Sequence, residues 1–290
     1  MHSYLKAIGF GNIKKEGEVE ALLEEVYREY SHRNAVKLPS GAFLEMRKEF
    51  APDMGIALCG MLDEEGFHRQ YYFPYYNGSG ITTKEDLIIE KRVGGDSFAG
   101  VCEDERVGVS LIFYLQNAAA YQKRQIDHQL FGQKVTTTFS GLSVSGMILL
   151  PIEKKQAPYP VDKSDSFKRN QLLSAARNGD PEAMESLTIE DMDLYAMISR
   201  RVFREDVYSI VDTFFMPYGM ECDQYQVMGT INSYNKVRNP VTNEKIYQMN
   251  IDCNDMNFDV CINETDLMGD PEVGRRFKGT IWLQGRVNFD

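Results

Sequence analysis

Cysteine and histidine are scarce in this 290-residue sequence. Its five cysteines are an odd number and form no CxxC pair, a pattern that predicts reduced, mostly buried thiols and no disulfide scaffold. The four histidines are His2, His32, His68 and His128. They show neither HExxH nor HxH spacing, so the sequence predicts no metal site, no cofactor and no catalytic residue that can be named.

Long hydrophobic runs and clusters of positive charge are also lacking. Residues 1–10 have no basic start followed by an apolar run, as a signal peptide would, and no run of about 18 apolar residues predicts a membrane span. The net charge is −11, which opposes non-specific binding to nucleic acid or to an anionic membrane. We therefore expect a cytoplasmic protein that binds neither a membrane nor nucleic acid non-specifically.

The first half of the chain combines one helix with many strands. Residues 18–30 carry apolar side chains at helical spacing, and residues 2–9 are expected to form a short strand. Further strands are predicted at 43–50, 55–61, 67–76, 87–92, 107–116, 135–139 and 142–150. This order predicts the α+β class, with a mostly antiparallel sheet domain over residues 1–150.

A proline-rich, charged stretch follows at 151–169 and is the predicted linker. Residues 170–204 are predicted to be a short helical segment, in which Asp180 caps a helix that begins at Pro181. Residues 205–290 are expected to form a third unit, a small OB-like β-barrel.

The hairpin within the C-terminal unit predicts its own register. Apolar residues alternate over 247–253 and again over 256–262, with opposite parity on either side of Asn254-Asp255. In a two-residue hairpin this parity pairs Cys253 with Met256 and puts the apolar residues on one face, which places Cys253 and Cys261 on opposite faces. Strands are also predicted at 224–237 and 277–289, with a helix beginning at Asp270-Pro271. The stretch 207–215 fits a helix or a strand, and as a strand it would be the fifth of the barrel.

One glycine motif and two clusters are candidates for binding. Gly9-Phe10-Gly11 lies where a phosphate loop would, but it lacks a third glycine and reads better as a tight turn. The first cluster is the tyrosine-rich edge, on a strand that Pro74 restricts to the edge of a sheet; its residues are Tyr71, Tyr72, Tyr75 and Tyr76. The second is a local basic and aromatic group of the kind that holds acidic partners or single strands in OB folds; its residues are Arg275, Arg276, Trp282 and Arg286.

Four stretches distributed over the chain together resemble one protein family. They are MHSYLKAIGF, GVSLIFYLQN, EDVYSIVDTFFMPYG and GRRFKGTIWLQGRV. The family that they resemble is an uncharacterised bacterial one, known only as a domain of unknown function and found in anaerobic gut bacteria. The resemblance spans the chain and implies a complete native chain with an unprocessed N-terminus. It implies no activity, substrate or site residue.

Two classes of function follow as expectations. The first is a non-catalytic cytoplasmic binding or regulatory protein, which holds a small ligand or a protein partner at the barrel face or the tyrosine-rich edge; single-stranded nucleic acid on the OB-like barrel is an alternative within this class. The second is an enzyme with a site in the cleft between the two domains, built from carboxylates and a histidine such as His68 or His128.

Overall fold

The computed structural model describes residues 2–39, 41–92, 96–129, 135–152, 172, 175, 180–186, 207–220 and 222–289. Most of the predicted linker at 151–169 and of the helical segment at 170–204 therefore lies outside the described residues. Within that segment, residues 181–186 are helical as expected. The carboxylate of Asp180 accepts the backbone N–H groups of Glu182 and Ala183, which confirms the predicted N-cap.

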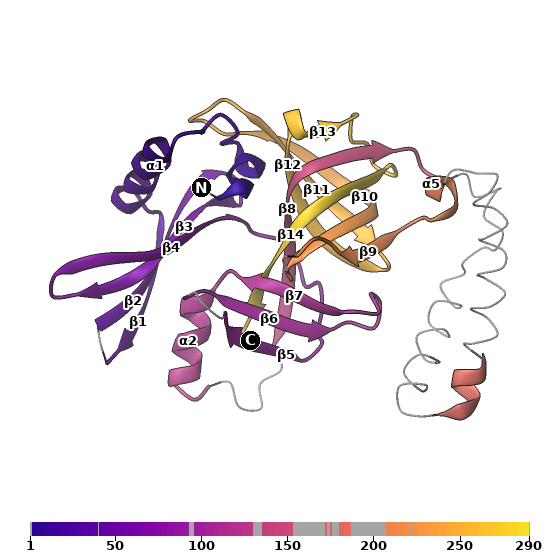
Figure 1. Cartoon of the computed structure of the whole chain (residues 1–290), viewed down its shortest axis with the longest axis horizontal. Coiled ribbons are helices and arrows are strands. Elements are labelled where there is room, and N and C mark those ends of the chain that lie inside the picture. The colour runs from indigo at the N-terminus through magenta and orange to yellow at the C-terminus, as the bar shows by residue number, and fades with distance from the viewer. Residues whose placement is uncertain are drawn as a thin grey trace.

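The N-terminal lobe is a four-stranded antiparallel sheet with a helix on one face (Figure 1). Its elements are η1 (Ser3–Ile8), α1 (Glu16–Arg28), β1 (His32–Leu38), β2 (Gly41–Ala51), β3 (Met54–Asp63) and β4 (Gly66–Tyr76). The predicted amphipathic helix is confirmed, because α1 buries Val19, Leu22, Leu23 and Val26.

The second sheet contains ten strands. Its strands and the helices between them are β5 (Leu87–Lys91), β6 (Phe98–Glu103), β7 (Ser110–Leu115), α2 (Ala118–Ile126), β8 (Thr136–Leu149), α5 (Val207–Ile210), β9 (Phe214–Pro217), β10 (Gln224–Arg238), β11 (Lys245–Cys253), β12 (Met256–Asn263), η2 (Glu264–Asp266), β13 (Leu267–Met268) and β14 (Arg276–Asn288).

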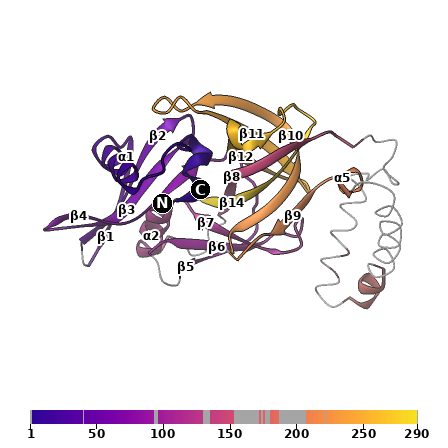
Figure 2. The ribbon, with the colours of Figure 1, turned by 45° about the horizontal axis from the view of Figure 1, so that its top comes forward.

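A closed five-stranded barrel forms the centre of the ten-stranded sheet (Figure 2). The strands follow the order β8-β12-β11-β10-β14, and β14 pairs again with β8 to close the ring. The β8–β12 pair is parallel, whereas the other barrel pairs are antiparallel. The expected α+β class with an OB-like barrel is therefore confirmed.

The fifth barrel strand comes from an unexpected part of the chain. The sequence suggests 207–215 for it, but residues 207–210 form the short helix α5, and β9 pairs only with β10 at the barrel rim. Strand β8, from the first half of the chain, fills the fifth place instead. The ten-stranded sheet thus takes strands from both sides of the predicted linker, and the division into domains at 150 and 205 stays a prediction.

The hairpin register is confirmed residue by residue. Cys253 pairs with Met256, Ile251 with Phe258 and Met249 with Val260. Asn254 and Asp255 both adopt left-handed backbone conformations, with φ of 55° and 60°, as this turn requires. The two cysteines also separate as expected. Cys253 packs inside the barrel, and Cys261 packs into the core between the barrel and the N-terminal lobe.

Two predicted elements are wrong. Within residues 2–9, Ser3–Ile8 form the 3₁₀ helix η1 and no strand. Tyr4, Leu5, Ala7 and Ile8 are buried in the core that the lobe shares with the barrel, a spacing that does not alternate as a strand would, and Gly9 ends the turn at φ 87°. No helix starts at Asp270-Pro271. Val273 is exposed and Gly274 turns at φ 86°, so the chain enters β14 directly.

Candidate functional site

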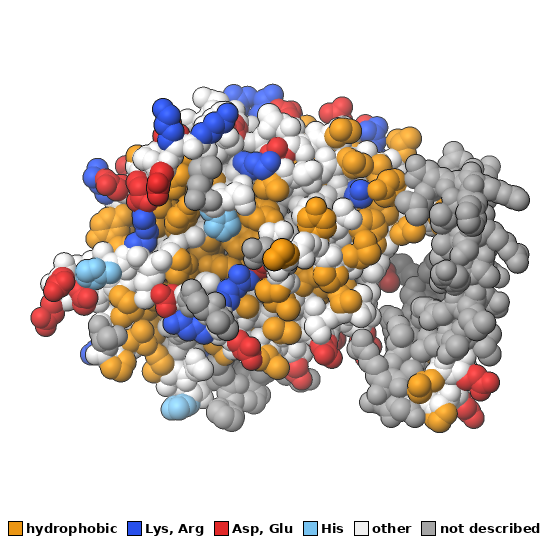
Figure 3. Space-filling view, viewed as in Figure 1, with side chains coloured by type: hydrophobic (Ala, Val, Ile, Leu, Met, Phe, Trp, Pro, Cys, Tyr) orange, Lys and Arg blue, Asp and Glu red, His pale blue; other side chains and the backbone are white. Residues whose placement is uncertain are grey.

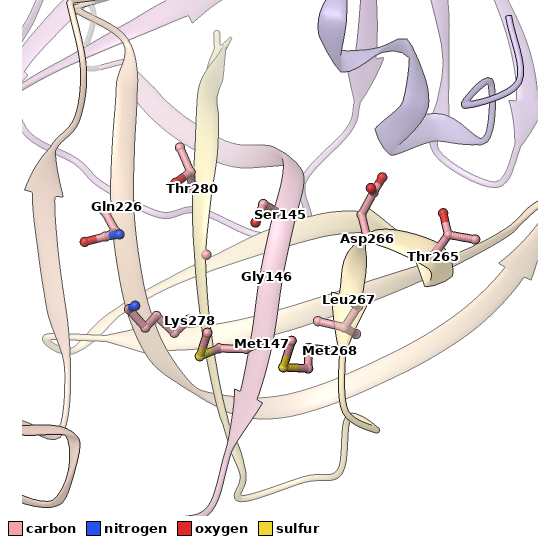
Figure 4. A pocket seen from close by; sticks show the side chains of 11 residues that line it. Ser145, Gly146, Met147, Gln226, Thr265, Asp266, Leu267, Met268, Lys278 and Thr280 are labelled. Carbon is pink, nitrogen blue, oxygen red and sulfur yellow. The ribbon is translucent and has the colours of Figure 1, made fainter. Parts of the chain in front are cut away.

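The barrel carries an open groove on its outer surface at the seam where it closes. We call this hollow of about 440 Å³ the barrel groove (Figure 4). It is lined by Ser145, Gly146, Met147, Gln226, Thr265, Asp266, Leu267, Met268, Lys278, Gly279 and Thr280. Its volume lies within the roughly 300–1,000 Å³ of small-molecule sites.

Strand register arranges the groove side chains in two rows. Gln226 of β10 lies opposite Thr280 of β14, which lies opposite Ser145 of β8. One pair of residues further along, Lys278 of β14 lies opposite Met147 of β8. Because successive side chains of a strand alternate between faces, each row continues on one outer surface (Figure 4). The result is a polar row of Gln226, Thr280 and Ser145 beside a second row that holds the ammonium of Lys278 and the thioether of Met147.

A β-bulge in β8 brings Ser145 and Met147 onto the same face as Thr280 and Lys278. The pairing of β8 with β14 shifts at Val144, because Ser145 pairs with Thr280 while Ser143 pairs with Ile281. The extra residue reverses the parity of β8, so that Ser145 and Met147 join the outer face although Ser143 is fully buried. Strand β13 extends the second row, since Met268 pairs with Met147.

Lys278 supplies the charge of the barrel groove. Its ammonium lies 4.7 Å from the centre of the Tyr208 ring, and no carboxylate among the described residues pairs with it. The nearby Asp266 is already neutralised, because Lys6 forms a 2.9 Å ion pair with it and also donates to the carbonyl of Val144. The groove therefore presents one positive charge that the described residues leave unbalanced.

The polar row offers hydrogen bonds that the described part of the protein does not use. The hydroxyls of Ser145 and Thr280 and the carboxamide of Gln226 have no hydrogen-bond partner among the described residues. A ligand with oxygen acceptors could take bonds from all three and from Lys278. The groove contains no His or Cys, and its single carboxylate is held by Lys6, so it lacks a pair of groups suited to proton transfer. Nor do three His, Cys, Asp or Glu side chains in the described ranges lie together as metal ligands would.

The tyrosine-rich edge lies on β4, which is an edge strand of its sheet as predicted. Its side chains, however, face inward. Tyr75 and Tyr76 are 1% and 6% exposed, and Tyr71 and Tyr72 are half-buried. Burial raises the pKa values of Tyr71, Tyr75 and Tyr76, so their hydroxyls stay neutral. These tyrosines therefore contribute mainly to the packing of the protein and present little open surface for a ligand.

The predicted basic and aromatic group does not share one exposed face. Arg276 is 4% exposed, and its guanidinium donates to the carbonyls of Leu150, Val211 and Tyr208. Desolvation lowers the pKa of Arg276, but these three acceptors satisfy its N–H groups. Arg275 pairs with Glu272 at 2.8 Å, and Arg286 is half-buried. Arg275 and Arg276 therefore bind groups of the protein itself, and the four residues form no common exposed surface.

Trp282 and Tyr72, one from each predicted cluster, both contact His2 in a largely buried aromatic cluster that the sequence did not reveal. The cluster consists of His2, Tyr4, Tyr72, Tyr114 and Trp282. The His2 ring lies 4.7 Å from Trp282 and 6.4 Å from Tyr72, and Tyr4 stacks on Trp282 at 5.4 Å. Burial lowers the pKa of His2 to about 4, and its buried Nδ1 has no hydrogen-bond partner among the described residues.

A buried carboxylate bonds to the tryptophan of this cluster. Asp223, 2% exposed, accepts the indole N–H of Trp282 at 2.8 Å and pairs with the guanidinium of Arg92. Arg92 also lies over the ring of Tyr114, 5.4 Å from its centre. These contacts connect the N-terminal segment, β7 and β14, so the aromatic cluster joins the lobe to the barrel.

Backbone N–H groups at the Gly9-Phe10-Gly11 turn, where a phosphate would bind, donate to a side chain of the protein itself. The carboxylate of Glu244, in the turn between β10 and β11, accepts the backbone N–H groups of Gly11 and Asn12 at 3.0 and 3.1 Å. Asn263 donates to the same carboxylate. This turn therefore fastens the N-terminal segment to the barrel, in place of holding a phosphate.

The histidines of the enzyme hypothesis lie at the surface. His68 is exposed and forms a 3.1 Å contact with Asp63, and His128 is exposed just after α2. Neither lines the barrel groove. On the face shown in Figure 3, basic and acidic side chains are interspersed with hydrophobic ones.

The usual ligand face of an OB barrel, on its second and third strands, is partly covered here by the N-terminal lobe. Gln248 of β11 donates to the carbonyl of Pro52, and Asp259 of β12 accepts from the backbone N–H and hydroxyl of Ser79. The groove lies instead beside the seam of β8 and β14. Its residues escaped the sequence reasoning because alternation marks 226, 278 and 280 as outward-facing but does not reveal that β8 is their neighbour.

The comparisons with known proteins give one match. A family model described as a domain of unknown function from E. rectale (DUF3881) matches residues 5–285. No curated protein and no solved structure matches the chain. In the described ranges, the helices are all too short or too polar to cross a membrane.

Proposed function

The chain belongs to this family of unknown function, which supplies no activity to start from, and we propose from the geometry that it is a non-catalytic cytoplasmic binding protein. Its ligand is a small amphipathic anion, such as a carboxylate or a phosphate ester with an apolar body. The ligand lies in the barrel groove, with its charged end at Lys278. The observation that carries the proposal is the pairing of a polar row with a row of Lys278 and methionines across the barrel seam.

The charge of the groove supports an anionic ligand. The protein has a net charge of −11, yet the groove holds an ammonium that no described carboxylate balances. A hydrogen bond between charged partners contributes about 1.5–3 kcal/mol. Ser145, Thr280 and Gln226 add neutral donors beside it, while Asp266 is shielded from the ligand by its ion pair with Lys6.

The apolar part of the ligand is held by flexible side chains. Met147 is half-buried and lies opposite Lys278, and Met268, which is 71% exposed, follows on the other side of Met147. Methionine adapts to ligands of different shape because its side chain is unbranched and polarizable. The affinity should therefore rise with the length of the apolar chain, by up to about 0.8 kcal/mol for each buried CH₂.

The test is a thermal-shift screen of straight-chain carboxylates and alkyl phosphates, followed by calorimetric titration of those that stabilise the protein. We expect Lys278→Met, which keeps an apolar stem and removes the charge, to weaken binding at least tenfold. Lys37→Met is the matched control, because Lys37 is exposed on β1, in the other sheet. Unchanged affinity in Lys278→Met, or turnover of the bound ligand, would contradict the proposal.

Single-stranded nucleic acid is less well supported by the geometry. Arg276 and Trp282, the residues that suggested it, are both buried and hydrogen-bonded within the protein. A fluorescence-anisotropy titration with short oligonucleotides, run beside the small-anion screen, separates the two ligand classes.

A further inference from the structure

A second hollow lies between the two sheets, away from the barrel groove. This lobe cleft, of about 280 Å³, opens between the sheet of the N-terminal lobe, the β5–β6 hairpin and α2. It is on the face of the lobe sheet opposite α1, since Lys48 pairs with Glu25 of α1, whereas its neighbour in sequence Arg47 donates to Gln116 beside α2. The cleft is lined by Leu38, Phe43, Met61, Gln70, Lys91, Asp96, Phe98, Gln122, Gln125 and Ile126.

A β-bulge places one polar side chain in the lobe cleft. In the pairing of β3 with β4, Cys59 lies opposite Tyr71 and Gly60 opposite Arg69, so Gln70 is the extra residue. A Cβ at Gly60 would lie 2.2 Å from the carbonyl oxygen of His68, so only glycine permits the bulged strand to approach this closely. Bulges of this kind redirect a side chain, and here Gln70 joins the lining of the cleft.

Two further carboxamides come from α2. Gln122 and Gln125 are three residues apart, so they lie on the same side of the helix. The side-chain amides of Gln70, Gln122 and Gln125 form no hydrogen bond with any described residue. Each carboxamide both donates and accepts, so the three, which come from β4 and from α2, together match a ligand that carries several hydroxyl groups.

The rest of the lobe cleft is apolar and electrically neutral. Phe43 is 3% exposed, and Phe98 is half-buried beside it in the lining. The two charged residues of the cleft, Lys91 and Asp96, neutralise each other in a 2.8 Å ion pair. The described lining therefore offers a charged ligand no unbalanced opposite charge, and a neutral ligand needs none.

We propose that the lobe cleft is a binding site for a neutral monosaccharide, whose hydroxyl groups bond to the three glutamines and whose apolar ring face lies on Phe43 and Phe98. A sugar ring carries both hydroxyl groups and an apolar face, and the lining of the cleft offers carboxamides for the first and phenyl rings for the second. The volume of about 280 Å³ accommodates one such ring and no extended chain. This site is separate from the barrel groove and does not rest on its ligand.

The experiment uses the full chain and ligand-observed NMR with neutral hexoses and N-acetylhexosamines. We expect saturable binding of at least one of them. The double variant Gln122→Ala/Gln125→Ala and the single variant Gln70→Ala should each weaken it at least fivefold. Alanine favours the helix, so α2 should remain folded, which a far-UV circular dichroism melt verifies. Gln129→Ala, an exposed glutamine just beyond α2, is the matched control and should bind as the wild type does.

Three results would overturn the proposal. They are the absence of saturable binding to every neutral sugar, equal weakening by Gln129→Ala, and preferential binding of free nucleobases or uronic acids over neutral sugars. Lys278→Met should leave sugar binding unchanged, so a failure at this site is distinguishable from a failure at the barrel groove.

Discussion

Titration of His2 is expected to weaken the folded protein as the pH falls below about 6.5, the ordinary pKa of histidine. In the folded state the imidazole is buried against Trp282, and this burial lowers its pKa to about 4. The unfolded chain therefore takes up a proton on His2 at a pH where the folded protein does not. The stability that neutral His2 permits is fully present above pH 6.5 and is lost progressively between pH 6.5 and 4.

The size of the effect follows from the two pKa values. With a pKa of about 4 in the folded state and about 6.5 in the unfolded state, the free energy of unfolding is lower by about 2 kcal/mol at pH 5 and by about 3 kcal/mol at pH 4 than at neutral pH. Replacing His2 by Phe keeps an aromatic ring in the cluster and removes the titrating group. It also removes the buried Nδ1, which no described residue bonds, so the variant should be at least as stable as the wild type at pH 8.

The assay is urea unfolding at a series of pH values from 8 to 5, for the wild type and for His2→Phe. Other groups titrate in both proteins, so the informative quantity is the difference between their free energies of unfolding. That difference should shift in favour of the variant by about 2 kcal/mol by pH 5. His32→Phe, at an exposed histidine, is the control and should follow the wild-type profile. A difference that does not change with pH would refute the assignment of a buried neutral imidazole.

Three other perturbations test the scaffold. Glu45→Ala removes the carboxylate that pairs with the largely buried Arg47, 3.0 Å away, and should cost about 3–5 kcal/mol in urea unfolding; a loss below about 1 kcal/mol would show that the carbonyl of Gln116, to which Arg47 also donates, is a sufficient partner. Asn254→Ala should cost about 1–2 kcal/mol more than Asn254→Gly, because both lose the 2.6 Å hydrogen bond from Thr213 but only alanine strains the left-handed turn; equal costs would contradict this. In a thiol-reagent assay only the exposed Cys222 should react quickly in the native protein, since the other four cysteines are buried and burial raises their pKa values; a second fast thiol would show that the core opens.

The local features of the fold could be predicted where the signal is contained in neighbouring residues. The alternation on either side of Asn254-Asp255 defines a hairpin whose register needs no information from the rest of the chain, and the structure confirms it. The helical spacing within α1 similarly predicts the buried Val19, Leu22, Leu23 and Val26, although Tyr27 and Tyr30, which continue the same spacing, are exposed near and beyond the end of the helix. Both patterns work because side-chain direction repeats with a fixed period along a strand or a helix.

The candidate sites could not be predicted in this way. Arg276 and Trp282 look like a surface motif in the sequence, but whether they are exposed depends on α5, β7 and the N-terminal segment packing around them. Gln70 enters the lobe cleft only because a bulge shifts β4 against β3. Neither the cover over a side chain nor a shift in pairing is encoded in the few residues around it.

The sequence by itself determined the class of the protein, the helix α1, the hairpin β11–β12 and the separation of Cys253 from Cys261, because each depends on short-range periodicity. The tertiary structure alone decided that β8 closes the barrel. That pairing joins segments more than a hundred residues apart, and it is selected by how whole strands fit together and not by any local pattern. The barrel groove exists only through this closure, which brings Ser145 and Met147 beside Thr280 and Lys278.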